Sequence, residues 1–411
     1  MIHIALLLHI YQPPCQSYTI LKKIAQESYI PFLNVIKKLS NAKITLNING
    51  SLTELLKTYE FEEVISLINE LVLAEKIRFT GSGMYHPILP LLPPEEVERQ
   101  IQLNEEYNSS VLENFAGIKG FFPPEMCISQ NTLNVVKKLG FKWIIADGVA
   151  CPAEWPTNKY YKYDDLAVLF RDSIISNEIA FKDISAMDLI RKLEVLFEQD
   201  YYLIIALDGE TFGHHIKDYE TLFLEKFINL INENEDIELV FVDDILNLYP
   251  SASVIRPIDS SWSTTHENII NEVPYPLWAN PVNRLHIIQN KLQEKVYEFI
   301  ELIKDESIKD KTDTKFQDCY QTVRRLLDKG EFSCKLWWAC PEHFDFNIII
   351  EGNQYLIKSA INALKCIMNM SNSKEIKFKA RNLYENILLE YQLLLREIGT
   401  HFEYKYKFGH F

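Results

Sequence analysis

Two carboxylates in this chain each directly follow a short apolar run. Asp208 ends the run "YYLIIAL" and opens "DGETFGHH", and Glu125 follows the apolar segment "GFFPP". Two carboxyl groups at the ends of strands are the minimum set for cleaving a glycosidic bond, because one attacks the anomeric carbon and the other protonates the leaving oxygen. That chemistry requires environments that push the two pKa values apart, so that one group is ionised while the other holds a proton.

The local sequence favours such a difference. Pro123 and Pro124 restrict the backbone before Glu125, which predicts a rigid turn. Asp208 follows a wholly apolar strand, where partial loss of hydration raises the pKa of a carboxyl group. Spacing alone leaves a simpler interpretation open, in which Asp208 caps the next helix and Glu125 is an ordinary loop residue.

The elements before residue 245 alternate between short apolar runs and amphipathic helical segments such as 94–115 and 130–140. Largely apolar strands separated by helices indicate a parallel sheet that is buried on both faces. Eight strand candidates favour a closed β/α barrel, although periodicity alone does not exclude a doubly wound sheet. The candidates are 2–8, 43–48, 77–80, 120–122, 142–146, 167–170, 202–207 and 238–242.

Polar or glycine residues follow the carboxyl ends of several of these candidates. In a β/α barrel this rim carries the active site, because the βα loops converge there. The pattern therefore predicts an enzyme before any motif is considered. The residues are His9, Asn49, Gly81 to Gly83, Glu125, Asp147 and Asp208.

The pattern changes after about residue 260, and from about 281 onward it predicts helices. Two stripes with steps of three or four residues indicate amphipathic helices, the last ending before Gly399. We expect a catalytic barrel over 1–260, followed over 261–411 by a connection and a helical bundle that completes the active-site cleft. The stripes are Leu285, Ile288, Leu292, Val296, Phe299 and Ile303, then Ile376, Ala380, Leu383, Ile387, Tyr391, Leu394 and Ile398.

Composition limits the possible partners and the location. The 42 Lys and Arg residues against 57 Asp and Glu residues give a formal charge of −15, which argues against a nucleic-acid partner. Seven widely spaced cysteines without a CxxC pair argue against a disulfide framework or a zinc cluster. No basic leader and no run of about 18 apolar residues occurs, so we expect a cytoplasmic protein that does not bind a membrane. An oligomer is compatible with the sequence.

Six segments in order resemble the signature regions of glycoside hydrolase family 57. This resemblance covers most of the chain and implies a seven-stranded, distorted β/α barrel with a C-terminal helical bundle, so eight strand candidates are one too many. It also implies a retaining enzyme that acts on α-glucans such as starch, glycogen or maltooligosaccharides, of the α-amylase or 4-α-glucanotransferase type. The segments are "HIYQPP" (9–14), "GSGMYHPILPLLP" (81–93), "GFFPPEMCIS" (120–129), "LDGETFGHH" (207–215), "SSWSTTHENIINEVPYPLW" (260–278) and "EFSCKLWWAC" (331–340).

The resemblance assigns roles to the two carboxylates. Glu125 in "PPEM" matches the family's nucleophile, and Asp208 in "LDGE" matches its general acid/base. His9 and Gln12 match the first motif, whose usual form is His-x-His-Gln-Pro. Tyr11 stands where the second histidine is usual, and a tyrosine can bond a sugar hydroxyl but cannot become cationic near neutral pH.

Further residues are candidates for substrate binding, each beside a plainer role. Tyr85 and His86 lie in the second motif, although a lone histidine beside apolar residues is often a core group. Glu210 and His214 would orient Asp208, or would cap and line the following helix. Trp337 and Trp338 would form a sugar platform, with one ring stacking and the other packing because neighbours on a helix point in different directions. Trp262 is interpreted as an anchor of the connection.

We expect no cofactor and no catalytic metal. The alternatives are a metal-dependent carbohydrate enzyme, such as a deacetylase or an α-mannosidase, and a non-catalytic glycan-binding protein. A zinc site needs three or four converging ligands, yet the one His-x-Asp pair, His343 to Asp345, lies in the helical region. Both carboxylates stand in their motifs, which disfavours a binding protein. Hydrolysis, transfer and branching, the linkage and length of the glucan, and the effect of Tyr11 stay open.

Overall fold

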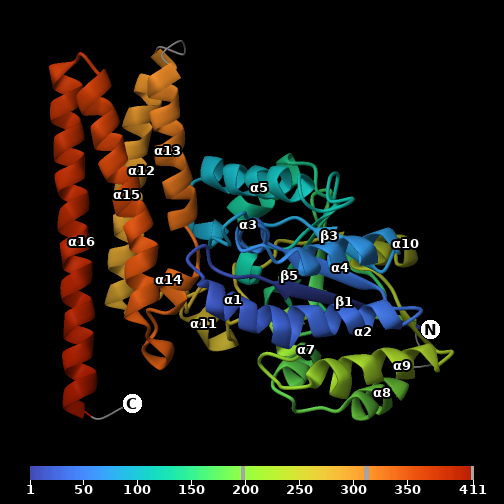
Figure 1. The fold of residues 1–411 in the computed structure, drawn as a ribbon. Coiled ribbons are helices and arrows are strands. Elements are labelled where there is room, and N and C mark those ends of the chain that lie inside the picture. Colours follow the sequence, from blue (N-terminus) through green and yellow to red (C-terminus); the bar gives the residue numbers. More distant parts are fainter. Residues whose placement is uncertain (196–199, 310–313, 409–411) are drawn as a thin grey trace. The chain divides into compact units, whose positions relative to one another are not determined.

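The computed structural model describes residues 1–195, 200–309 and 314–408. The chain divides into two compact units, Met1–Ile269 and Ile270–Phe411. The first contains the strands and the second consists of helices, and each is described by itself (Figure 1).

The first unit is a (β/α)7 barrel. One sheet has the order β3-β2-β1-β8, and a second contains β7-β5-β4. A parallel bridge between Gly81 and Phe121 joins β3 to β4, and the amide of Asp172 donates to the carbonyl of Ile204 at 2.9 Å, which joins the end of β7 to β8. The barrel strands are β1 (Ile2–Ile10), β2 (Ile44–Ile48), β3 (Ile77–Thr80), β4 (Gly120–Phe121), β5 (Trp143–Asp147), β7 (Leu166–Arg171) and β8 (Tyr201–Asp208).

The eighth strand candidate, 238–242, is not a barrel strand, so that prediction is wrong. Its first part forms β9 (Ile237–Leu239), which pairs with Ile2–Ile4 at the start of β1. The rest of this apolar run leaves the sheet, and Val240 and Val242 pack into the barrel interior. Two strands without a predicted counterpart, β6 (Tyr160–Tyr163) and β10 (Ser251–Val254), extend the second sheet beyond β7.

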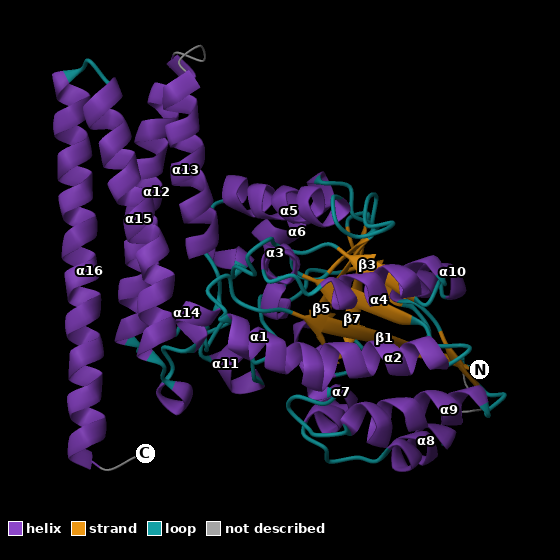
Figure 2. Cartoon of the chain, viewed as in Figure 1, coloured by secondary structure: helices purple, strands orange, loops and turns teal. Residues whose placement is uncertain are grey.

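Helices surround the strands and bury their apolar faces against them (Figure 2). Ser129, Asp172 and Ser185 each accept a backbone N–H at the start of a helix, as capping residues do. The α-helices are α1 (Tyr18–Ile24), α2 (Ile30–Lys38), α3 (Gly50–Thr58), α4 (Glu62–Leu73), α5 (Pro94–Ser109), α6 (Gln130–Lys138), α7 (Ser173–Ala180), α8 (Ala186–Glu194), α9 (Lys226–Asn232), α10 (Ile245–Leu248) and α11 (His266–Ile270). Short 3-10 turns are η2 (Leu89–Leu91), η3 (Pro124–Met126), η4 (Gly148–Ala150), η5 (Gly209–Thr211) and η7 (Val242–Asp244), and π-helical turns are η1 (Ala25–Tyr29) and η6 (Glu220–Glu225).

Side chains alternate between the two faces of each barrel strand, as the period of two requires. On β1, Leu6 and Leu8 belong to the core under the helices, whereas Ala5 and Leu7 fill the barrel interior. The same alternation on β8 sends Ala206 inward. The next inward residues are His9 on β1 and Asp208 on β8, at the carboxyl end of the barrel.

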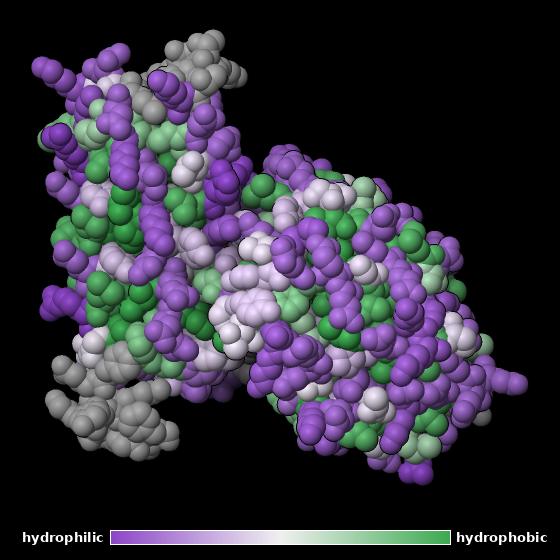
Figure 3. Space-filling view, viewed as in Figure 1, coloured by the Kyte–Doolittle hydropathy of each residue, from purple (hydrophilic) through white to green (hydrophobic). Residues whose placement is uncertain are grey.

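The second unit is a bundle whose helices follow the predicted stripes. Leu292, Val296 and Phe299 are fully buried, as are Ala380, Ile387 and Leu394 in the last helix. The helices are α12 (Arg284–Lys309), α13 (Thr314–Gly330), α14 (Cys334–Trp337), α15 (Phe346–Met370) and α16 (Lys374–Phe408), with the 3-10 turn η8 (Pro341–His343). On the face of this unit drawn in Figure 3, apolar side chains lie between rows of hydrophilic ones.

Two expectations for the bundle need correction. The last helix does not end before Gly399 but continues to Phe408, because one glycine costs only about 1 kcal/mol in a helix whose neighbouring turns are packed. A disulfide joins Cys319 of α13 to Cys366 of α15, so one cross-link is present where no disulfide framework was expected. Within the described ranges, no helix has the length and apolar character needed to cross a membrane.

Candidate active site

Six polar side chains form a layer at the carboxyl end of the barrel. The strand register pairs His9 with both Asp208 and Asn47, Asn47 with Thr80, and Asp147 with Arg171. Hydrogen bonds follow this register: His9 Nδ1 lies 2.6 Å from Asn47 Oδ1, and Asn47 Nδ2 donates to Thr80 Oγ1 at 2.8 Å. Below this layer the interior is apolar, so polar groups are concentrated where the βα loops converge.

Asp208 is the carboxylate of this layer on β8. It occupies the N-cap position of η5, yet its side chain makes no capping hydrogen bond, so the simpler interpretation as a helix cap is not supported. Burial raises the pKa of the Asp208 carboxyl, while His9 and Arg171 act in the opposite direction. A proton is therefore held more tightly here than on an ordinary aspartate.

Arg171 supplies the positive charge of the layer. It is 4% exposed and donates from Nη1 to Asp147 Oδ2, from Nε to the carbonyl of Ala206 and from Nη2 to Asn177 Oδ1, each at 2.7 Å. Its guanidinium also lies 5.8 Å from the centre of the Trp262 ring. Arg171 thus fixes the ends of β5, β7 and β8 relative to one another.

Glu125 lies on η3 with φ 57° and ψ 18°, in the left-handed region that non-glycine residues rarely adopt. The indole Nε1 of Trp262 donates to Glu125 Oε2 at 2.9 Å, and the Trp262 amide donates to the Glu125 carbonyl at 3.2 Å. On its other oxygen, Oε1 lies 3.7 Å from His86 Nδ1. The carboxyl group is held on both sides, and its side chain keeps 15% exposure.

A group of stacked rings connects the two carboxylates. The His9 ring stacks on Phe122 at 5.0 Å and on His86 at 4.9 Å, and the Tyr11 ring stacks on His86 at 3.9 Å between centroids. Burial lowers the pKa of His9 and, more strongly, that of His86. The charge of the neighbouring His9 lowers the pKa of His86 further. Neutral imidazoles therefore line the path from Asp208 to Glu125.

Glu210, two residues after Asp208, is a second buried carboxyl group. Its Oε1 accepts from the Tyr29 hydroxyl at 2.5 Å, from Gln12 Nε2 at 3.2 Å and from the Tyr11 amide at 3.4 Å. Burial and the charge of Asp208 raise the pKa of Glu210 to about 8. The structure thus brings Gln12 together with Glu210, which lies two positions after Asp208 on the same loop.

Comparison with known proteins identifies the family. Residues 9–257 match the sequence model described as glycosyl hydrolase family 57. The chain belongs to this family. It is 26% identical over 271 residues to an alpha-amylase of Pyrococcus furiosus, covering 62% of this chain and 40% of that protein. It is also 22% identical over 318 residues to a 4-alpha-glucanotransferase of Thermococcus litoralis, covering 73% and 44%.

A solved structure has the same fold as this chain. The exo-type maltose-forming amylase of Pyrococcus sp. ST04 superposes with a TM-score of 0.74 at 16% identity, covering 98% of this chain and 85% of that one. The chain spans about two fifths of the length of the first curated relatives that it matches. Sequence comparison therefore establishes the family, and the solved structure establishes the fold.

Two predicted site residues of this family-57 chain, Tyr85 and His214, make side-chain contacts with residues other than the two carboxylates. The hydroxyl of Tyr85 donates to Glu54 at 3.4 Å. His214 Nδ1 lies 2.7 Å from Glu27 Oε2, so its contact is with η1 rather than with Asp208. That Tyr85 and His214 contact the substrate stays a prediction.

Trp337 and Trp338 belong to the helical unit. Their rings meet edge to face at 4.7 Å and 87°, so they point in different directions as expected for neighbours on a helix. Trp337 stacks on His343 at 3.8 Å, and Trp338 packs against the core of the bundle. A sugar platform on either ring stays a prediction.

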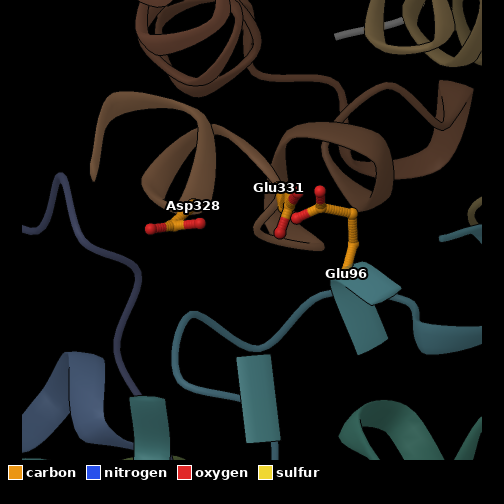
Figure 4. Close-up of side chains that lie close together, drawn as sticks. All are labelled: Glu96, Asp328 and Glu331. Carbon is orange, nitrogen blue, oxygen red and sulfur yellow. The ribbon is translucent and has the colours of Figure 1, made fainter. Parts of the chain in front are cut away.

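The metal-site alternative lacks a ligand set in the described part of the chain. There, no three His, Cys, Asp or Glu side chains that include Glu125, Asp208 or a histidine bring ligand atoms within 4.8 Å of one another. Figure 4 draws three other acidic residues, Glu96 of α5 and Asp328 and Glu331 of the helical unit. Asp328 pairs with Arg324 at 3.2 Å, and Glu331 accepts from Tyr297 at 2.8 Å.

Several residues of the site were not predicted from the sequence, among them Asn47, Thr80, Arg171, Trp262 and Tyr29. Asn47 lies inside the predicted strand 43–48 and Arg171 one residue beyond the predicted strand 167–170, so the alternation of each strand could have found both. Trp262 stood in a noticed motif but was assigned to the connection. Tyr29 carries no local signal, because its contact with Glu210 depends on a π-helical turn that periodicity does not reveal.

Proposed function

We propose that this chain is a retaining enzyme for α-glucans, with Glu125 as the nucleophile and Asp208 as the general acid/base. The observation that carries the proposal is the contrast between the two carboxyl groups. Glu125 accepts a hydrogen bond from an indole N–H, which favours a carboxylate. Asp208 is buried with a raised pKa, which favours a bound proton. The α-amylase and 4-α-glucanotransferase names of the relatives support the substrate class.

The reaction then has two steps. The Glu125 carboxylate attacks the anomeric carbon while Asp208 gives its proton to the leaving glycosidic oxygen. In the second step the Asp208 carboxylate takes a proton from the incoming hydroxyl, which displaces Glu125 from the sugar. The same intermediate serves hydrolysis and transfer, since water or a sugar hydroxyl can resolve it.

The residues around the carboxylates are proposed to bind sugar. His9, His86 and Tyr11 offer ring edges and one phenol hydroxyl to sugar hydroxyl groups, and Gln12 fixes Glu210 behind them. Because burial lowers the pKa of both histidines, they would act as neutral hydrogen-bonding groups. Neutral partners suit a glucan, which carries no charge.

Product analysis tests the proposal. Purified protein is incubated with a maltooligosaccharide series and with glycogen, and the products are resolved by size and linkage. Glucose or maltose alone would assign hydrolysis, longer oligosaccharides transfer, and new branch points branching. The Glu125→Gln variant is the matched control, since it keeps a hydrogen-bond acceptor for Trp262 but removes the nucleophile. No change in any α-glucan would refute the proposal.

The remaining parts of the proposal concern setting and partners. We propose that the enzyme is cytoplasmic and that its partner is its glucan substrate. We propose that it binds neither nucleic acid nor a membrane, and that it can form an oligomer. The net charge of −15 supports the absence of a nucleic-acid partner. Cell fractionation and light scattering of the purified protein test location and oligomeric state.

A further inference from the structure

The indole ring of Trp262 is held at the carboxyl end of the barrel by three separate segments. It packs, partly buried, against the core of the barrel interior. The ring meets Phe122 edge to face at 6.1 Å and 76°, and His9 of β1 at 6.1 Å and 73°. The guanidinium of Arg171 on β7 lies 5.8 Å from the ring centre. These contacts restrict both the place and the plane of the ring.

Two N–H groups of Trp262 hold Glu125. The indole Nε1 donates to Glu125 Oε2 at 2.9 Å, and the backbone amide donates to the Glu125 carbonyl at 3.2 Å. Because both donors belong to one residue, the main chain and the carboxyl group of Glu125 are held in one frame. The last torsion of a glutamate side chain has only broad preferences of its own. The indole bond therefore selects the orientation of this carboxyl group.

The turn that carries Trp262 is itself fixed in the structure. Ser260 and Ser261 are fully buried, and Ser260 forms an antiparallel bridge with Ile128. The amide of Ser261 donates to Thr264 Oγ1 at 2.8 Å, and the hydroxyl oxygens of these two residues also lie 2.8 Å apart. The indole donor thus stands on a turn that is closed by its own side chains and tied to the segment after the carboxylate.

An attacking carboxylate reacts only from a narrow range of positions. The reacting atoms must approach to about 3–3.5 Å with aligned orbitals, and a misplacement of about 1 Å can cost about 100-fold in rate. A hydrogen bond from an N–H group also favours the charged form of a carboxyl group, which is the form that attacks. One indole donor can therefore provide both the orientation and the ionisation of a nucleophile.

We propose that Trp262 is the positioning residue of the nucleophile, because its indole N–H orients the Glu125 carboxyl group and favours the carboxylate. This inference rests on the proposed role of Glu125. His86, 3.7 Å from Oε1, and the thiol of Cys127 are titratable side chains beside this carboxyl group. Burial lowers the pKa of His86, and burial followed by the Glu125 charge raises the pKa of the thiol. Both groups are therefore uncharged near neutral pH.

The Trp262→Phe variant tests the proposal, because it keeps an aromatic ring but removes the indole donor. We expect kcat/KM at the pH optimum to fall about 10- to 100-fold, the size of one lost hydrogen bond to a charged group. The acidic limb of the profile should also move to higher pH, since the carboxylate form loses a stabilising donor. A loss without any change in the shape of the profile would overturn the proposal.

A maltooligosyl fluoride separates an effect on the nucleophile from an effect on the acid. Fluoride leaves without needing a proton, so Asp208 contributes little to the first step with this substrate. Trp262→Phe should still slow the reaction, because the attack by Glu125 is still required. A wild-type rate with the fluoride beside a loss with maltooligosaccharides would place the effect on Asp208 and would overturn the proposal.

Trp143→Phe is the matched control. The indole Nε1 of Trp143 donates to Asp243 Oδ1 at 2.5 Å, so this variant also removes a bond between an indole and a carboxylate. Trp143 is the first residue of β5, at the end of the strand opposite Asp147. At a temperature where circular dichroism shows both variants to be folded, Trp143→Phe should keep the wild-type pH profile. The same shift of the acidic limb in both variants would count against the proposal.

A readout independent of turnover distinguishes this inference from the proposed function. The six tryptophans give few indole N–H signals in NMR, and the signal lost in Trp262→Phe identifies Trp262. That signal should shift with pH as Glu125 ionises, and Glu125→Gln should abolish the pH dependence. An active chain whose Trp262 signal does not respond to Glu125 would overturn this inference alone. A chain inactive on every α-glucan would refute the proposed function, and with it the nucleophile that Trp262 positions.

Discussion

Replacement of Arg171 by methionine should destabilise the barrel strongly. The Arg171–Asp147 pair is buried, with side-chain exposures of 5% and 4%, at 2.7 Å. Methionine keeps much of the packing volume but leaves the Asp147 carboxylate without its cation. Breaking a buried pair in this way costs about 3–5 kcal/mol, and each kcal/mol lowers Tm by roughly 2–4 °C in a domain of this size. We therefore expect a fall in Tm of roughly 10 °C.

Thermal and urea unfolding followed by circular dichroism measure this loss. Arg191→Met is the control, because the Arg191–Asp188 pair is exposed at 66% and 60% and should change stability by no more than about 0.5 kcal/mol. Changing Asp147 to asparagine as well should recover part of the loss, since the unpaired charge is then absent. A loss below about 1 kcal/mol in Arg171→Met would refute this account of the polar layer.

The same substitution should also act on the pH profile. The charge of Arg171 opposes the rise in the pKa of Asp208. Without it, Asp208 holds its proton more tightly, so the basic limb of kcat/KM should move to higher pH. A shift to lower pH would contradict the assignment of Asp208 as the acid.

Three further predictions concern the reaction. In a complex with substrate, the carboxyl groups of Glu125 and Asp208 should face each other at roughly 5–5.5 Å, and a separation beyond about 9 Å would contradict a retaining mechanism. A chelator should leave activity unchanged, whereas loss followed by rescue with zinc would support the metal-dependent alternative. With an activated aryl glycoside, the Asp208→Ala variant should accumulate the glycosyl-enzyme, and added azide should release a product of retained configuration. The Glu125→Ala variant with azide should instead give a product of inverted configuration. The opposite pattern would exchange the two roles.

Much of the barrel could be predicted because buried parallel strands leave continuous apolar runs. Seven of the eight candidates lie on barrel strands, including the two-residue β4. The eighth failed for a physical reason: an apolar run also arises where a loop turns its side chains into a barrel, as Val240 and Val242 do. In the bundle, Gly399 marked no helix end, because the neighbouring turns are held by packing of Leu394 and Ile398.

The site was predictable where a motif or a strand end marked it. Asp208, Glu125 and His9 were singled out that way, and in the structure stacked rings lie between the two carboxyl groups; their roles stay predictions. Side chains outside the motifs that lie far from Asp208 in the sequence but near it in the structure were not predicted. Arg171 and Tyr29 lie 37 and 179 positions away from Asp208 in the sequence, distances over which local pattern carries no information.

The connection after the barrel explains how Glu125 is kept in a strained conformation. Glu125 and Met126 both have positive φ, 57° and 49°, at a cost on the order of 1–3 kcal/mol each. Such a turn persists only when its surroundings determine it. Ile128 and Ser260 form an antiparallel bridge, and two positions further Trp262 holds both the carbonyl and the carboxyl group of Glu125. The "SSW" segment thus holds the proposed nucleophile through backbone and side chain together, so Trp262, interpreted as an anchor of the connection, also contacts the carboxyl group of Glu125.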